Sequence, residues 1–171
     1  MGRADSSHYI ALSEQRRVRG RPPVILEHAA MTQCELCHAQ GEVVLWQNEN
    51  CRVISVVDND YPGFCRVVWQ QHVKEMTDLK TDEQQKIMYV IFAVEQAVRE
   101  VMRPDKINLA SLGNVTPHLH WHVIPRYTDD RHFPNSVWGK PQRKLARLAF
   151  AERTPADWQT RLGMRIQQIL N

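Results

Sequence analysis

Short hydrophobic runs separated by polar turns fill the chain from residue 43 to residue 69. The runs lie at 43–46, 51–57 and 64–69, and they are rich in β-branched and aromatic residues. Asn48-Glu49-Asn50 separates the first two runs, and Pro62-Gly63 precedes the third. Such runs bounded by turn-forming clusters predict three strands joined by tight connections.

A helical period replaces this pattern after residue 80. One apolar stripe recurs at three- and four-residue steps, at Ile87, Val90, Ile91, Val94, Val98 and Val101. We expect Thr81 and Gln84 to form a capping box at its start, because their spacing allows reciprocal hydrogen bonds. Pro104 is expected to end the helix, since proline cannot continue one.

The second half of the chain predicts two more strands and a C-terminal helix. The strands are expected at 108–112 and 118–124, with a Gly113-Asn114 turn between them. A helix is predicted from Thr154-Pro155, burying Trp158, Leu162, Ile166 and Ile169, and a shorter one from Lys144 to Ala151. These elements indicate an α+β fold, in which an antiparallel sheet of about five strands packs against one long helix plus the C-terminal helix.

The pattern divides the 171 residues into three parts. Residues 1–30 lack sustained periodicity and are interpreted as an N-terminal tail. Residues 31–130 hold the predicted sheet and long helix and form the core of the domain. Residues 131–171 are interpreted as a basic helical extension, including Trp138, that packs on the same domain and completes either the site or a dimer.

Composition and charge narrow the classes of function. Charged residues at 24% and hydrophobic residues at 43% are ordinary globular usage. The longest apolar run, Met88–Val94, is far shorter than a membrane span, and the first thirty residues lack a secretory core. We therefore expect a cytoplasmic protein without a membrane partner. The last 41 residues hold eight basic and two acidic side chains, interpreted as a solvated helix face rather than a nucleic-acid site.

Cys34 and Cys37 have the spacing of a metal or redox pair. The alternative is two reduced, partly buried thiols. Together with His38 they also match the haem attachment pattern, but the missing export signal argues against haem. Cys51 and Cys65 lie in strand-like runs and are expected to be small core residues.

The stretch His118-Leu-His120-Trp-His122-Val-Ile124 carries the strongest chemical signal. Alternate residues of a strand share a face, so three imidazoles are expected on one side and apolar residues on the other. One interpretation is a three-histidine zinc site that activates water. Another is a nucleophilic imidazole oriented by its neighbours. Residues two apart lie roughly 6–7 Å apart along a strand, which favours the nucleophile. A solvated histidine-rich face is the third alternative.

At these residues the chain closely resembles the histidine triad (HIT) family, whose motif alternates three histidines with hydrophobic residues. His118–Ile124 matches that motif completely, and Pro125-Arg126 is a frequent ending. Gly113-Asn114-Val115 and residues 72–79 resemble two further family segments. The resemblance covers roughly residues 34–126.

The resemblance implies a nucleotide hydrolase or transferase that acts at an α-phosphate. By position, His120 would be the nucleophile that forms a nucleotidyl-histidine. His122 would act beside the scissile phosphate and leaving group, and His118 would help to fix the site. Asp58 corresponds to a ribose-binding position, and the candidate phosphate contacts are Asn108 and Asn114.

The implied substrates are dinucleoside polyphosphates or nucleoside phosphoramidates, with adenosine as the expected base. The chemistry needs no haem, flavin or nicotinamide. A homodimer with the long helix near its interface is the family's common assembly. Two departures stand out: Phe64 replaces a frequent histidine after the Pro-Gly turn, and Val115 replaces a Ser or Thr donor.

The resemblance also implies a structural zinc site. In zinc-containing relatives, two cysteines join two histidines at positions that correspond here to Cys34, Cys37, His72 and His118. Such a closed site would leave His120 free for chemistry. Two rival functions remain at this point: a metal-dependent hydrolase that uses the three histidines as ligands, and a catalytically weak nucleotide-binding protein.

Overall fold

The computed structural model describes residues 34–144 and 154–171. The expected tail of residues 1–30 and nearly all of the expected helix at 144–151 lie outside these ranges. The elements are, in chain order, β1 (Val43–Gln47), β2 (Cys51–Ser55), β3 (Cys65–Trp69), η1 (Met76–Asp78), α2 (Thr81–Met102), β4 (Lys106–Ala110), β5 (His120–Arg126) and α4 (Trp158–Leu170). No helix in the described ranges is long and apolar enough to cross a bilayer.

The strands form one antiparallel sheet in the order β1-β2-β3-β5-β4, which confirms the expected fold. The last two strands differ from their predicted ranges. β4 begins two residues early because Lys106 and Ile107 pair with the end of β5, at Arg126 and Pro125. A strand edge set by pairing with a distant partner is not visible in local hydrophobicity.

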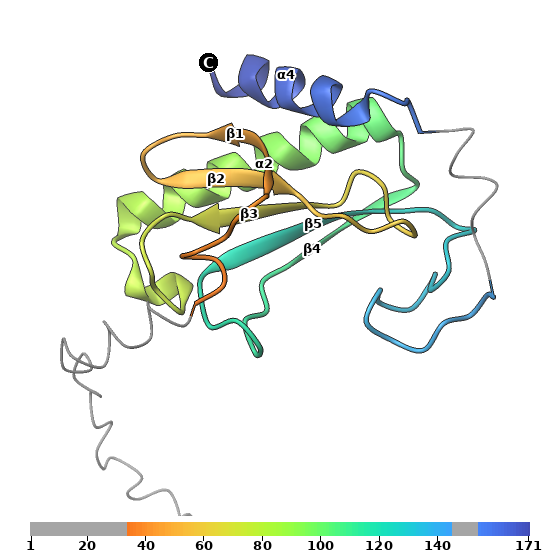
Figure 1. The fold of residues 1–171 in the computed structure, drawn as a ribbon, viewed down its shortest axis with the longest axis horizontal. Helices are drawn as coiled ribbons and strands as arrows, with labels where there is room; N and C mark the ends of the chain where they lie inside the picture. The colour runs from red at the N-terminus through yellow and green to blue at the C-terminus, as the bar shows by residue number, and fades with distance from the viewer. Residues whose placement is uncertain (1–33, 145–153) are drawn as a thin grey trace, which may run out of the picture.

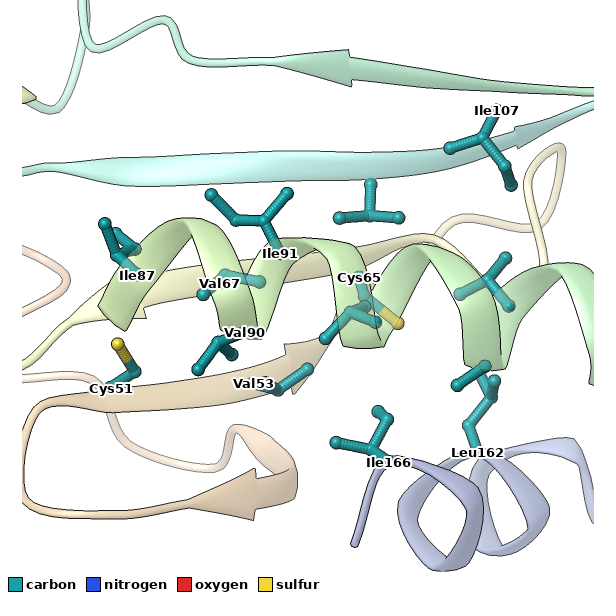
Figure 2. Packing of buried hydrophobic residues seen from close by; sticks show 14 of the residues in the cluster. Cys51, Val53, Cys65, Val67, Ile87, Val90, Ile91, Ile107, Leu162 and Ile166 are labelled. Carbon is teal, nitrogen blue, oxygen red and sulfur yellow. The ribbon is translucent and has the colours of Figure 1, made fainter. Parts of the chain in front are cut away.

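Both long helices cover the same face of the sheet (Figure 1). Figure 2 shows side chains of α2 and α4 meeting those of the strands in one apolar layer. Its fully buried members include Val53, Val67, Cys65, Ile91, Val94, Leu162 and Ile166. Cys51 and Cys65 belong to this core, as expected, so their thiols do not face the histidines.

The start of α2 differs from the predicted capping box. Lys80 is the N-cap, and its backbone N–H donates to Glu83 Oε2 at 2.8 Å. The Gln84 side chain instead donates to the Leu79 carbonyl at 2.9 Å. The prediction was therefore wrong by one residue, because Glu83 takes the position that Gln84 was expected to fill. The helix ends at Met102, and Arg103 adopts a left-handed φ of 50° before Pro104.

Residues 131–143 form loops rather than a helix, so the helical extension is restricted to α4 in the described chain. α4 begins at Trp158, three residues after Pro155, and buries Leu162 and Ile166 as expected. Gly163 allows its close approach to β1, because a Cβ there would lie 2.9 Å from the Leu45 carbonyl oxygen. α4 thus completes the core.

Candidate active site and adjoining metal cluster

The face of the sheet away from the helices carries the candidate site. Across the ladder, His122 pairs with Arg66 on β3 and with Ala110 on β4, while His120 pairs with Val68. Directly paired residues of neighbouring strands point to the same face. Leu119 and Val123 point the other way and belong to the core, which confirms the predicted alternation for this part of the motif.

His118 departs from the expected row of three imidazoles. β5 begins only at His120, and the residues before it follow a separate set of backbone bonds. The Leu119 N–H donates to the Val73 carbonyl at 2.7 Å, and the Trp69 N–H donates to the Leu119 carbonyl at 3.1 Å. The His118 ring contacts His72 at a centroid distance of 5.1 Å, whereas the His120 ring contacts His122. The triad is therefore divided between two clusters.

Backbone carbonyl groups determine the tautomer of His120. Its Nδ1 lies 2.6 Å from the His118 carbonyl oxygen, and a carbonyl only accepts, so Nδ1 carries the proton. Nε2 then holds the lone pair of the neutral ring, and it has no hydrogen-bond partner among the described residues. Burial lowers the pKa of His120, which keeps the ring neutral. This ring is suited to nucleophilic attack through Nε2.

His122 lies in an aromatic environment beside His120. Its ring is 4.8 Å from that of His120, 5.6 Å from Phe64 and 5.1 Å from Trp138, measured between centroids. Its buried Nδ1 has no hydrogen-bond partner among the described residues. Burial, with smaller contributions from His120 and Arg66, lowers the pKa of His122 to about 4. His122 is therefore neutral at physiological pH.

Four predicted metal ligands come together beside this pair. The ligand atoms of Cys34, Cys37, His72 and His118 all lie within 4.8 Å of one another. His118 Nε2 donates to the Trp69 carbonyl at 2.7 Å, so its Nδ1 presents a lone pair to the two sulfur atoms, each 3.4 Å away. Cys37 Sγ also lies 3.3 Å from His72 Nδ1.

These distances fit a tetrahedral zinc ion. Ordinary zinc–sulfur and zinc–nitrogen bonds place neighbouring sulfur and nitrogen ligands about 3.5 Å apart. Burial and the neighbouring Cys34 thiol raise the pKa of Cys37 to about 11, so without a cation the Cys37 thiol stays protonated. A bound cation would favour the thiolate forms. The donor set therefore fits zinc and offers four protein ligands, as a structural site does.

A buried ion pair supports the loop that follows β5. Arg126 is 2% exposed and donates from Nε to Asp130 Oδ2 at 2.7 Å, and from Nη1 to Asn108 Oδ1 at 2.6 Å. Asp130 is fully buried and also accepts the backbone N–H groups of His132 and Phe133. These bonds anchor the loop that carries Trp138 back to His122.

The remaining candidate residues have different surroundings. Asn108 pairs with Ile124 on the histidine face, with its amide oxygen held by Arg126. Asp58 lies after β2, where its carboxylate accepts the Asp60 N–H at 2.9 Å. Asn114 is exposed in the β4–β5 loop, beside the 94% exposed Val115. Asp58 and Asn114 form no hydrogen bond with the histidines within the described ranges.

Sequence reasoning missed two side chains of the site. Arg66 was counted as part of an apolar strand, although a charged residue between Cys65 and Val67 could have marked the polar face of β3. Trp138 was placed in an extension expected to complete the site or a dimer, but its contact with His122 was not predicted, because that contact depends on the loop path. No local pattern encodes that path.

Comparisons with known proteins agree with this geometry. A family model described as HIT domain matches residues 39–129. The chain belongs to this family, the histidine triad proteins. A solved histidine triad protein from Bradyrhizobium japonicum is 30% identical, with a TM-score of 0.60, covering 73% of this chain and 90% of that one.

Two further similar proteins are more distant. A zinc-bound histidine triad family protein from Mycobacterium smegmatis is 19% identical, with a TM-score of 0.52 over 82% of this chain and 94% of that one, a likeness of fold alone. An AP-4-A phosphorylase from Mycobacterium tuberculosis is 30% identical over 84 residues, or 46% of this chain and 43% of that protein. The chain thus spans less than half the length of this curated relative.

Proposed function

We propose that this protein is a nucleotide hydrolase or transferase that cleaves a phosphoanhydride or phosphoramidate bond at the α-phosphate, with adenosine as the preferred nucleoside. The observation that carries the proposal is the hydrogen bond from His120 Nδ1 to the His118 carbonyl. It leaves Nε2 of a neutral, buried imidazole as the available nucleophile. Membership in the HIT family and the similarity to an AP-4-A phosphorylase support the same class of chemistry.

The proposed reaction has two displacement steps. His120 Nε2 attacks the α-phosphorus, a nitrogen–phosphorus bond forms, and the bond to the leaving group breaks with its electron pair on that group. Water then attacks the same phosphorus, the nitrogen–phosphorus bond breaks, and the nucleoside monophosphate leaves with one proton released. His122 stands beside the scissile bond, and the His118 carbonyl stabilises the positive charge that develops on the His120 ring.

Three polar residues complete the proposed nucleotide site. Asn108 and Asn114 are proposed phosphate contacts, and Asp58 is the proposed partner of the ribose hydroxyls. Asn108 has the firmest support, because it lies on the histidine face and Arg126 fixes its amide oxygen, leaving the amide N–H groups as donors. Trp138, in the loop after β5, packs against the His122 ring and is proposed to cover this side of the site.

The Cys34, Cys37, His72 and His118 cluster is proposed to hold a structural zinc ion. Zinc bound there would tie the segment before β1 to the sheet and would take no part in the displacement. A hydrolase with zinc on all three triad histidines is disfavoured, because His118 directs its free nitrogen at the cysteines, away from the His120 pair.

The proposal extends to assembly and location. We propose a homodimer with α2 near its interface, supported by Tyr89 and Phe92, which are 58% and 54% exposed on that helix. Light scattering of the wild type and of a Phe92→Glu variant tests this. A cytoplasmic location is proposed because none of the four described cysteines forms a disulfide, as expected in a reducing compartment.

The test is a single-turnover experiment with adenosine phosphoramidate and diadenosine tetraphosphate, quenched without acid and analysed by mass spectrometry. An adenylyl group on His120 is expected within the first turnover. A His122→Gln variant serves as the matched control, because it retains the nucleophile and should still be labelled, more slowly. Nucleotide binding with no adduct and no turnover would instead indicate a nucleotide-binding protein.

A further inference from the structure

Arg66 lies on the candidate site face without a defined partner. It is the second residue of β3 and pairs directly with His122 on β5 and with Ile54 on β2. Directly opposed residues place their Cβ atoms about 4.5–5.5 Å apart, so the guanidinium belongs to the surroundings of the two histidines. The charge on Arg66 contributes to lowering the pKa of both His120 and His122, which agrees with this placement.

The three arginines that the described strands place on this face differ in their partners. Arg52 donates to Glu42 Oε2 at 3.0 Å and to the Leu36 carbonyl at 2.6 Å. Arg126 is held by Asp130 and Asn108. Arg66 donates no hydrogen bond to any described residue, and its buried Nε has no partner.

The acidic residues near Arg66 do not neutralise it by direct contact. Glu42 is bonded to Arg52, and Glu35 is exposed and acts on Arg66 only through its charge. A buried donor without a partner destabilises the folded protein. A charged side chain kept in this state beside a catalytic pair is suited to receive an anionic ligand from outside the protein.

We propose that Arg66 binds the phosphate groups on the leaving-group side of the substrate, and that the enzyme therefore prefers nucleotides joined by a phosphoanhydride to nucleoside phosphoramidates. The inference rests on the proposed function, since it selects between the two substrate classes that function allows. It assigns to Arg66 direct contact with substrate.

The chemistry of the two leaving groups explains the preference. When a phosphoanhydride bond breaks, the bridging oxygen leaves with the electron pair, and the departing phosphate gains negative charge. A guanidinium stabilises this charge without transferring a proton. An amine released from a phosphoramidate must instead gain a proton, which a guanidinium does not supply at neutral pH. Phe64 and Trp138, the other neighbours of His122, carry no charge.

The first test compares kcat/KM for diadenosine tetraphosphate and adenosine phosphoramidate in the wild type, Arg66→Met and Arg66→Lys. Loss of one charge-assisted contact should lower kcat/KM for the tetraphosphate about 10- to 100-fold and change that for the phosphoramidate by less than about 3-fold. Arg66→Lys should fall in between, because it retains the charge but not the forked geometry. Arg99→Met, on the exposed part of α2, is the control and should match the wild type.

Equal losses on both substrates, or no loss on either, would overturn the inference. Thermal unfolding of the variants separates folding from recognition: Arg66→Met removes a buried, unpartnered donor and should not lower Tm. A lower Tm with equal losses would indicate a structural arginine.

A second measurement does not depend on turnover. Calorimetric titration with inorganic pyrophosphate should show affinity in the wild type that weakens about 10-fold or more in Arg66→Met. Equal affinities would refute the anion contact. If His120 is never adenylylated but pyrophosphate binding still depends on Arg66, the proposed function fails and the anion contact stands.

Discussion

His118 and His120 are two residues apart, and backbone carbonyls fix them in opposite ways. His118 donates from Nε2 to the Trp69 carbonyl and turns Nδ1 toward two cysteines. His120 donates from Nδ1 to the His118 carbonyl and keeps Nε2 available. The same side chain thus presents its lone pair to the two cysteines at one position and leaves it available to a ligand two residues later.

The difference teaches that residue type and spacing do not assign a role to a histidine. The assignment comes from the ring nitrogen that meets a carbonyl oxygen, because this bond decides where the lone pair lies. The two clusters also share one peptide, since the acceptor for His120 belongs to His118. A change at the metal cluster is therefore expected to reach the nucleophile through the backbone.

The largest expected effect on activity comes from replacing His120, and it should contrast with the effect of replacing His118. His120→Ala should lower turnover roughly 10⁴-fold or more while thermal stability stays close to that of the wild type, because the nucleophile itself is lost. His118→Ala, in contrast, should lower both Tm and the metal content. Steady-state kinetics and thermal melts on both variants provide the check, and a His120→Ala protein with normal turnover would contradict the mechanism.

Next in size is the effect of opening the metal cluster. Cys37→Ser should release zinc and lower Tm on the order of 10 °C, because structural zinc contributes to folding free energy. Elemental analysis and thermal melts measure both quantities. Cys65→Ala is the control, since its thiol lies in the core and should leave the metal content unchanged. Equal zinc content in the wild type and Cys37→Ser would remove the site from the proposal.

A smaller effect is expected from pH. The pKa of His122 is about 4 in the folded protein and about 6.5 when unfolded, so the unfolded chain binds the extra proton first. Its contribution to stability is complete above about pH 6.5 and falls as pH drops toward 4, by about 2 kcal/mol at pH 5. Urea unfolding at pH 7 and pH 5 measures the decrease in the free energy of unfolding. In His122→Gln this decrease should be smaller by the share that His122 contributes. If the free energy of unfolding falls equally in His122→Gln and in the wild type, the lowered pKa of His122 is contradicted.

The most direct test of the opposite protonation of His118 and His120 measures the tautomers themselves and changes neither activity nor stability. Long-range proton–nitrogen NMR at pH 7 should show His120 protonated on Nδ1 and His118 protonated on Nε2. The same tautomer in both rings would disprove the opposite arrangement.

The sequence predicted the sheet, the long helix and the buried face of α4, because each follows from a local hydrophobic period. It also predicted the four residues of the metal cluster, through the family resemblance. The departure of His118 from the strand could not be predicted, since it depends on bonds from Leu119 and Trp69 to partners elsewhere in the chain. The role of Arg66 was missed for a similar reason: strand register sets its neighbours.

The Gly163–Leu45 contact has a practical consequence for protein engineering. Gly163 lets α4 approach β1, so that Leu162 and Ile166 join the hydrophobic layer after a connection of some thirty residues from β5. Deleting α4 would remove these two fully buried side chains from the layer. Variants that lack α4 should therefore expose apolar surface and aggregate.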